Sequence, residues 1–112
     1  MNTKYPIYIP SKNRADIGYT ANSFLKDGVD FKIVVEPSQY ENYLKFYDKS
    51  LILVLPEDNM RLLGSRLWIR EHSIKAGFDR HWQFDDNIRG CQYSTKGIRI
   101  DCNFNIGISA IE

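Results

Sequence analysis

One uninterrupted apolar run limits what this chain folds into more than any other feature. Residues 51–55 read Leu-Ile-Leu-Val-Leu, with no polar residue at alternate positions. A strand with one face in water alternates apolar and polar residues, whereas a strand covered on both faces reads as a continuous apolar run. Pro56 follows directly and ends the run. We therefore expect a buried strand in a parallel sheet that has helices on both faces.

Three more short runs, rich in apolar and β-branched residues, predict three further strands. They are residues 5–9, residues 31–35 and residues 81–84. The segments between the strands carry apolar residues at helical spacing, so strand and helix alternate along the chain.

The first predicted helix begins between Asp16 and Thr20 and ends at Gly28, which suits a C-cap. Its predicted apolar face consists of Ile17, Ala21, Phe24 and Leu25. The second helix is predicted to begin with a capping box, in which the side chains of Ser38 and Glu41 each satisfy a backbone donor.

The spacing of apolar residues predicts which side of the second and third helices faces the core. In the second, the core residues are predicted to be Tyr40, Tyr43, Leu44 and Tyr47. The third spans about residues 60–76, and Leu63, Leu67 and Ile74 lie close to one face. Four strands with three helices between them give an open, mostly parallel α/β sheet, most commonly in the order 3-2-1-4.

Asp85, Asp86 and Asn87 follow the fourth predicted strand directly. Their oxygens are the ligands that Mg²⁺ or Mn²⁺ prefers, and two adjacent carboxylates repel each other unless a cation lies nearby. The alternative is a polar turn, because Asp and Asn are common turn formers. These three residues are therefore candidate metal ligands.

The loop after the first strand carries Ser11, Lys12 and Arg14. In a sheet of order 3-2-1-4, ligands bind beyond the carboxyl ends of the strands where the order reverses, between the first and fourth strands. The acidic loop after the fourth strand would face this basic loop there. A diphosphate bridged by a metal needs both, because carboxylates hold the ion while Lys and Arg neutralise phosphate charge.

Composition narrows the classes of function. Fifteen basic and fourteen acidic side chains give a net charge of +1, so bulk charge does not indicate a nucleic-acid-binding protein. No apolar run is long enough to span a bilayer, and the N-terminus lacks a signal-peptide core. The spacing of Cys91 and Cys102 fits neither a C-x-x-C redox motif nor a zinc pair. We expect free thiols and a cytoplasmic protein.

No general base emerges from the sequence. His81 lies on the fourth predicted strand and is expected to be structural, and His72 is expected on the surface of the third helix.

Five motifs give the chain a distinctive signature when they are read in order. They are Ile-Pro-Ser-Lys-Asn-Arg at 9–14, Val-Val-Glu-Pro at 34–37, Leu-Val-Leu-Pro at 53–56, Trp-Ile-Arg-Glu-His at 68–72, and His-Trp-Gln-Phe-Asp-Asp-Asn-Ile-Arg-Gly at 81–90. Together they resemble the TET-associated glycosyltransferases, phage and phage-like enzymes with a GT-A fold. The resemblance covers residues 5–90 and weakens toward the C-terminus.

The resemblance implies roles for individual positions. Asp85, Asp86 and Asn87 match the Asp-x-Asp-like motif that grips the donor ribose and the metal, Mn²⁺ or Mg²⁺, on its diphosphate. The residues implied to bind the nucleotide-sugar are Ser11, Lys12, Arg14, Glu36, Pro37, Asp85, Asp86 and Arg89. The implied reaction moves a sugar from a nucleotide-sugar, expected to be a UDP-sugar, to hydroxymethylated pyrimidines in DNA, in the host cytoplasm if the chain is phage-encoded.

Two departures from the family pattern leave other functions open. The run Gly64-Ser65-Arg66-Leu67-Trp68 lacks the polar pair that precedes the family's tryptophan. GT-A enzymes are also longer, and their remaining part carries acceptor binding. We therefore expect residues 1–112 to form one nucleotide-sugar-binding domain, truncated at its C-terminal end, with a missing half or a separate chain binding the acceptor.

Two alternatives remain beside a glycosyltransferase. One is a metal-dependent nucleotidyltransferase, which normally uses a Gly-rich phosphate loop that residues 11–14 do not supply. The other is a non-catalytic remnant that binds a nucleotide.

Overall fold

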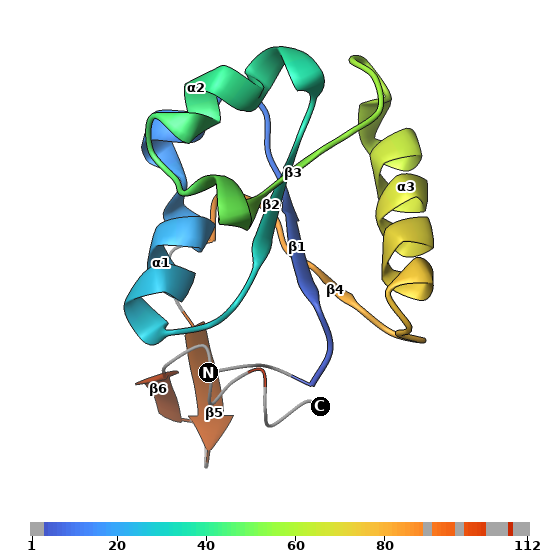
Figure 1. Cartoon of the computed structure of the whole chain (residues 1–112). Helices are drawn as coiled ribbons and strands as arrows, with labels where there is room; N and C mark the ends of the chain where they lie inside the picture. Colours follow the sequence, from blue (N-terminus) through green and yellow to red (C-terminus); the bar gives the residue numbers. More distant parts are fainter. Residues whose placement is uncertain (1–3, 89–90, 96–97, 103–107, 109–112) are drawn as a thin grey trace.

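The computed structural model describes residues 4–88, 91–95, 98–102 and 108. Four strands form one parallel sheet in the order β3-β2-β1-β4, so the predicted fold class and strand order are confirmed (Figure 1). The strands are β1 (Ile7–Pro10), β2 (Lys32–Val35), β3 (Ile52–Val54) and β4 (Trp82–Gln83). From β1 the chain adds β2 and then β3 on one side, and it returns to place β4 on the other side of β1. The strand order therefore reverses between β1 and β4.

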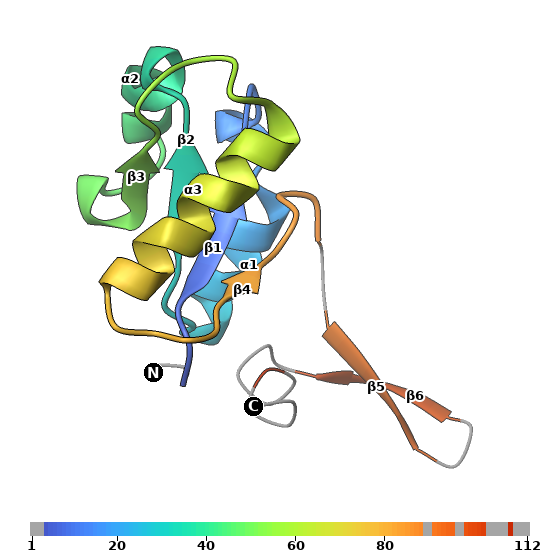
Figure 2. The same cartoon turned by 90° about the vertical axis from the view of Figure 1, so that its right-hand side faces the viewer.

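Between residues 4 and 88, three helices flank the sheet, together with three short 3-10 turns. The helices are α1 (Tyr19–Asp27), α2 (Tyr40–Leu44) and α3 (Arg61–Lys75); the turns are η1 (Ala15–Ile17), η2 (Pro37–Gln39) and η3 (Lys49–Leu51). α1 and α2 cover one face of the sheet and α3 covers the other (Figures 1 and 2). The three-layer arrangement buries both faces, as a parallel sheet requires.

α1 ends as predicted at Gly28, whose φ of 70° lies in the left-handed region that glycine adopts without steric cost. Ala21 and Phe24 are buried, but Ile17 and Leu25 are exposed, so the predicted apolar face is only half right. The helix rests on the sheet through a narrow stripe.

The predicted capping box at the start of α2 is wrong. Ser38 lies inside η2, which Pro37 opens, and the backbone N–H of Ser38 donates to Asp58 Oδ1 at 3.0 Å. The helical segment begins two residues later, and Glu41 then falls in its first turn without a side-chain cap. Proline suits the first position of a helical turn because it has no N–H to satisfy. The predicted core residues Tyr43 and Tyr47 are buried, whereas Leu44 is exposed.

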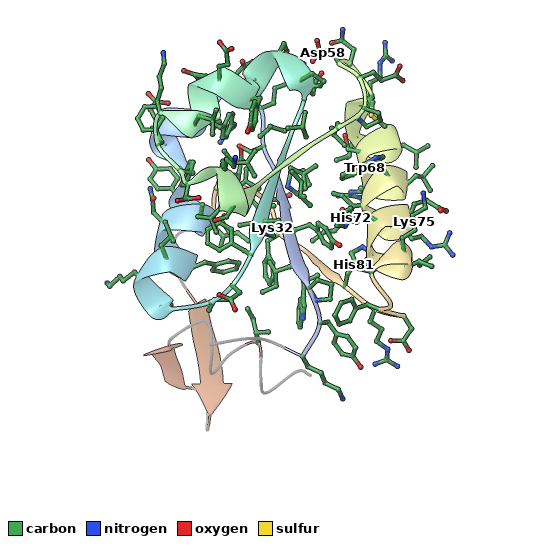
Figure 3. All side chains as sticks on the ribbon, in the orientation of Figure 1. Lys32, Asp58, Trp68, His72, Lys75 and His81 are labelled. Atoms are coloured by element: carbon green, nitrogen blue, oxygen red, sulfur yellow. The ribbon has the colours of Figure 1, made fainter. Side chains whose placement is uncertain are left out.

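α3 presents a different face to the sheet from the one predicted. Leu63 is 71% exposed, and Leu67 and Ile74 are also exposed, while Ile69 and Ser73 are buried. In Figure 3, Trp68 and His72 point from α3 toward the sheet and Lys75 points away from it. His72 Nδ1 lies 2.8 Å from the hydroxyl of Tyr8 on β1, so the prediction of a surface histidine is wrong.

The run that predicted a doubly covered strand is only partly buried. Ile52 is buried, Leu53 is half-buried and Val54 is exposed, because β3 is the edge strand and pairs only with β2 among the described residues. Helices cover an edge strand less completely than a central strand. The predicted parallel sheet is confirmed, whereas the prediction that residues 51–55 form a strand buried on both faces is wrong.

After the sheet, the chain forms an antiparallel hairpin of β5 (Cys91–Thr95) and β6 (Ile98–Cys102). This hairpin projects away from the four-stranded sheet (Figure 2). Ile108, further along, is buried in the core on the α1 side, with Ile7 and Phe24. No helix in the described part of the chain combines the length and apolar character needed to cross a membrane.

Candidate functional site

A cleft of about 600 Å³ opens beyond the carboxyl ends of β1, β2 and β3 and reaches the beginning of α3. Its volume falls in the range usual for small-molecule sites. The lining residues are Pro10, Ser11, Lys12, Val34, Glu36, Leu55, Asn59, Arg61, Leu62, Ser65 and Asp86. Four residues predicted from sequence to bind a nucleotide-sugar therefore lie around one cleft: Ser11, Lys12, Glu36 and Asp86.

A chain of hydrogen bonds fixes the loop that follows β1. The backbone N–H of Arg14 donates to Tyr43 Oη at 3.2 Å, Tyr43 Oη lies 2.5 Å from Ser11 Oγ, and Ser11 Oγ donates to Asp86 Oδ2 at 2.9 Å. Burial raises the pKa of the Tyr43 phenol, which keeps its proton available for Ser11. Tyr43 thus joins the loop after β1 to the loop after β4.

Lys12 and Glu36 connect the two sides of the cleft. Lys12 Nζ lies 3.0 Å from Glu36 Oε1, and Glu36 Oε2 accepts the backbone N–H of Asn59. The Asn59 hydrogen bond, followed by that of Lys12, lowers the pKa of Glu36 below its usual value. Asn59 has a φ of 60°, a conformation that asparagine tolerates better than most residues. The carboxylate therefore ties the end of β2 to both neighbouring loops.

Arg14 lies beside the acidic loop. Its Nε is 3.8 Å from Asp86 Oδ2, the same oxygen that accepts the Ser11 hydrogen bond. Both cations of the first loop are thus paired with acids, Lys12 with Glu36 and Arg14 with Asp86. An incoming anion meets cations whose charge is already balanced.

Thr20 is a residue that sequence reasoning missed. It lies in the first turn of α1 and is 0% exposed, and it makes three hydrogen bonds to the acidic loop. Its Oγ1 donates to the Asp85 carbonyl and accepts the Ile88 N–H at 2.8 Å, and its own N–H donates to the Asp86 carbonyl at 3.4 Å. The only sequence signal was a threonine in the first turn of a helix, a position that carries no information about a loop 65 residues away.

Asp85 and Asn87 line a second, smaller hollow of about 160 Å³ with Asp86 and Arg66. This hollow shares Pro10, Leu62 and Asp86 with the larger cleft, so the two are neighbours. Asp85 and Asn87 are exposed. The acidic loop therefore presents carboxylate and amide oxygens to one hollow and a partnered carboxylate to the cleft.

Two carboxylates and one amide oxygen, grouped in one loop, form a donor set suited to a hard divalent cation. In the described part of the chain, no group of three or more His, Cys, Asp or Glu residues is placed to hold a metal. Such a cation takes six or more oxygen ligands, so most would have to come from water and from a phosphate. The loop fits a metal that arrives together with a diphosphate.

The remaining predicted residues lie elsewhere. Pro37 is exposed at the start of η2 and does not line the cleft. Arg89 lies outside the described residues. His81 Nε2 lies 2.9 Å from Gln83 Nε2, and burial, followed by the charge of Arg70, lowers the pKa of His81.

Comparison with known proteins gives one match. The family model described as TET-Associated Glycosyltransferase matches residues 5–108, which is nearly the whole chain. Neither the curated proteins nor the solved structures contain a match. The matched span includes both loops of the cleft, α3 and the hairpin. The chain belongs to the TET-associated glycosyltransferase family.

Proposed function

We propose that this chain binds a nucleotide-sugar in the cleft beyond β1 and β2 and transfers the sugar to hydroxymethylated pyrimidines in DNA. One observation carries the proposal: the cleft brings together polar residues from three loops, Ser11 and Lys12 after β1, Glu36 after β2, and Asp86 after β4. Ligands of α/β sheets bind beyond the strand ends where the strand order reverses, and Ser11 and Asp86 lie on the two sides of that reversal, after β1 and β4. Membership of a glycosyltransferase family supplies the reaction class.

The pairing of charges in the cleft favours a diphosphate with a cation over a bare anion. Lys12 and Arg14 are each paired with a carboxylate, so the cleft has little net positive charge of its own. A diphosphate that binds must displace these acids from their partners or bring positive charge with it. In the first case the released carboxylates repel the diphosphate, and in the second the diphosphate carries its own cation. In both cases nucleotide binding depends on a divalent cation.

Asp85, Asp86 and Asn87 would hold the cation, Mn²⁺ or Mg²⁺. When bound, a divalent cation neutralises charge that develops on a leaving phosphate. Lys12, which also lines the cleft, would neutralise phosphate charge once Glu36 releases it. Ser11, held by Tyr43, offers a hydroxyl at a fixed place between the two loops.

We do not assign the base for the acceptor hydroxyl to either histidine. His72 is hydrogen-bonded to Tyr8, and His81 is paired with Gln83; neither lines the cleft. Acceptor binding is expected to need a further segment or a separate chain, because a base in duplex DNA must be flipped out of the stack before it reacts.

Thermal stability in the presence of UDP and Mn²⁺ tests donor binding. We expect a rise in Tm with both together and a smaller one with either alone, since ligands that bind only the folded state stabilise it. Asp86→Ala is expected to abolish the rise. Asp79→Ala is the matched control, because Asp79 is an exposed aspartate in the turn that precedes β4 and lies away from the cleft.

Turnover separates the remaining possibilities. Transfer of the sugar to hydroxymethylated DNA supports the proposal, and binding without any turnover identifies a nucleotide-binding remnant. Transfer of a nucleotidyl group would indicate a nucleotidyltransferase. If neither UDP nor any other nucleoside diphosphate raises the Tm, the proposed donor site is wrong.

A further inference from the structure

The two cysteines of the chain lie directly opposite each other in the β5–β6 hairpin. Cys91 is the first residue of β5, Cys102 is the last residue of β6, and the antiparallel register pairs them. The same register pairs Tyr93 with Ile100. The separation of Cys91 and Cys102, eleven positions in the sequence, matches no redox or zinc motif. The pairing becomes evident only from the strand register.

Register pairing brings two cysteines within bonding range. Directly opposed residues of antiparallel strands have Cα atoms about 4.5 to 5.5 Å apart and lie on the same face of the ladder. A disulfide needs a Cα separation of about 4.4 to 6.8 Å, so either kind of opposed pair satisfies it. Diagonal neighbours, about 7 to 8 Å apart, lie outside that range.

We propose that Cys91 and Cys102 form a reversible thiol–disulfide pair that locks the hairpin at its open end. A two-stranded hairpin with no third strand is marginally stable in water. β5 and β6 pair only with each other among the described strands. A bond between the first residue of β5 and the last residue of β6 closes the whole hairpin into a loop. The longer the closed loop, the more the bond restricts the unfolded chain.

The oxidant is a low-molecular-weight disulfide such as oxidised glutathione. The Cys91 thiolate attacks one glutathione sulfur, the glutathione S–S bond breaks, and one glutathione thiolate leaves. The Cys102 thiolate then attacks the Cys91 sulfur of the mixed disulfide and releases the second glutathione. Two cysteine thiols lose two electrons, one glutathione disulfide gains them, and the two protons end on the two glutathione thiols. The reverse exchange reopens the hairpin.

The proposed pair is independent of the donor site. In the part of the chain that the structure describes, β5 and β6 pair with each other and add no strand to the four-stranded sheet. We expect the change in Tm caused by UDP and Mn²⁺ to be the same in the oxidised and reduced proteins. Failure of one proposal leaves the other standing.

Equilibration of the full chain in graded mixtures of reduced and oxidised glutathione tests the proposal. After the thiols are blocked and the protein is digested with trypsin, cleavage at Lys96 and Arg99 separates the two cysteines. Residues 90–96 and 100–112 then stay joined only if the bond exists. We expect these peptides to be joined within one chain, and reduction to separate them.

Two variants control for the register. Ile100→Cys with Cys102→Ser places the cysteines on a diagonal, and we expect it to need about tenfold more oxidised glutathione, or more, than the natural pair. Tyr93→Cys and Ile100→Cys, with Cys91→Ser and Cys102→Ser, restores direct opposition and is expected to oxidise like the natural pair. Equal oxidation of the diagonal pair, bonds only between chains, or failure of both opposed pairs would overturn the proposal.

Discussion

The two faces of the sheet are covered in different ways. Under α1 and α2 lies a broad apolar cluster that includes Phe24, Phe31 and Tyr43, with Phe24 edge-on to Phe31 and Phe84. Under α3 the buried cluster is smaller; among the described residues it consists of Tyr8, Val34, Leu55 and Ile69. Beside it lie polar contacts, including the Tyr8–His72 hydrogen bond and a buried Gln83 Oε1 that has no hydrogen-bond partner among the described residues.

This difference assigns separate tasks to the two faces. The α1–α2 face carries both anchors of the candidate site, Thr20 and Tyr43, which hold the loops after β4 and β1. The α3 face contributes Arg61, Leu62 and Ser65 to the wall of the cleft. Because apolar burial supplies most of the stability of a domain, the loops are anchored to the more stable face and α3 forms a wall with less packing behind it.

Truncation of one buried side chain on each face gives the largest expected effects. Phe24 and Ile69 are both 0% exposed. We expect Phe24→Ala to lower the free energy of unfolding by about 4 kcal/mol and Ile69→Ala by about 2 to 3 kcal/mol, measured by urea denaturation. If Phe24→Ala does not fold, Phe24→Leu is expected to cost about 1.5 kcal/mol. A larger cost for Ile69→Ala would reverse the comparison.

A smaller test concerns the close approach of α1 and the α2 side. A Cβ added at buried Gly18 would overlap the hydroxyl of Tyr47, and the next nearest atom, Tyr47 Cζ, is 3.4 Å away. We expect Gly18→Ala to cost about 2 kcal/mol through overpacking. Tyr47→Phe removes the hydroxyl, so the double variant is expected to recover most of that loss. Equal destabilisation of the single and double variants would show that the approach is not tight.

Thr20→Val tests the anchor of the acidic loop at nearly constant volume. It removes both hydrogen bonds of Oγ1, and we expect a loss of about 1 to 3 kcal/mol in the free energy of unfolding, because the Ile88 N–H loses its partner. The variant is also expected to weaken UDP–Mn²⁺ binding, and Thr20→Ser to restore it. Normal binding by Thr20→Val, at unchanged Tm shift, would mean that the loop holds its shape without the anchor.

The pH dependence of stability gives the smallest effect and separates the two faces. The pKa of His81 is lowered from its ordinary value of 6.5, so the unfolded chain takes up this proton before the folded one does. The α3 face therefore contributes full stability above pH 6.5 and loses part of it as the pH falls below 6.5. Besides Arg70 on α3, the groups facing His81 include Ser73, Tyr8 and the Gln83 amide.

For Glu36 the pKa is lowered from 4.5, so its contribution is present above pH 4.5 and is lost below it. Urea denaturation between pH 7.5 and 3.5 is expected to show two successive declines. His81→Asn should remove only the first decline and Glu36→Gln only the second. A first decline that persists in His81→Asn would assign it to another group.

Sequence alone predicted the sheet well, because strands are short and their apolar runs are unambiguous. It predicted α3 poorly, since Leu62, Leu63, Leu67, Ile69 and Ile74 surround the helix and leave no single apolar stripe. Contacts between segments distant in sequence decide which side of α3 faces the sheet. Tyr8 on β1 is hydrogen-bonded to His72, so the side of α3 that carries His72 faces inward.

The residues of the candidate site likewise fall into those that the sequence predicted and those that it did not. Polar residues at strand ends were predictable, because topology sets where strand ends meet. The residues that hold them, Thr20, Tyr43 and Asn59, were not, since each acts through a hydrogen bond to another segment and sits in an ordinary helical or loop context. No local pattern in the sequence signals such bonds.

The Thr20 anchor also bears on how the site changes over evolution. It grips only backbone groups of the acidic loop, the carbonyls of Asp85 and Asp86 and the N–H of Ile88. The loop's path is therefore set independently of the side chains at positions 85 and 87, both of which are exposed. Under the proposed function, substitutions there would exchange one set of ligand atoms for another on an unchanged backbone. Metal and donor preference would then diverge at those two positions without a cost to the fold, whereas Asp86, bound to Ser11 and near Arg14, is not free to vary in this way.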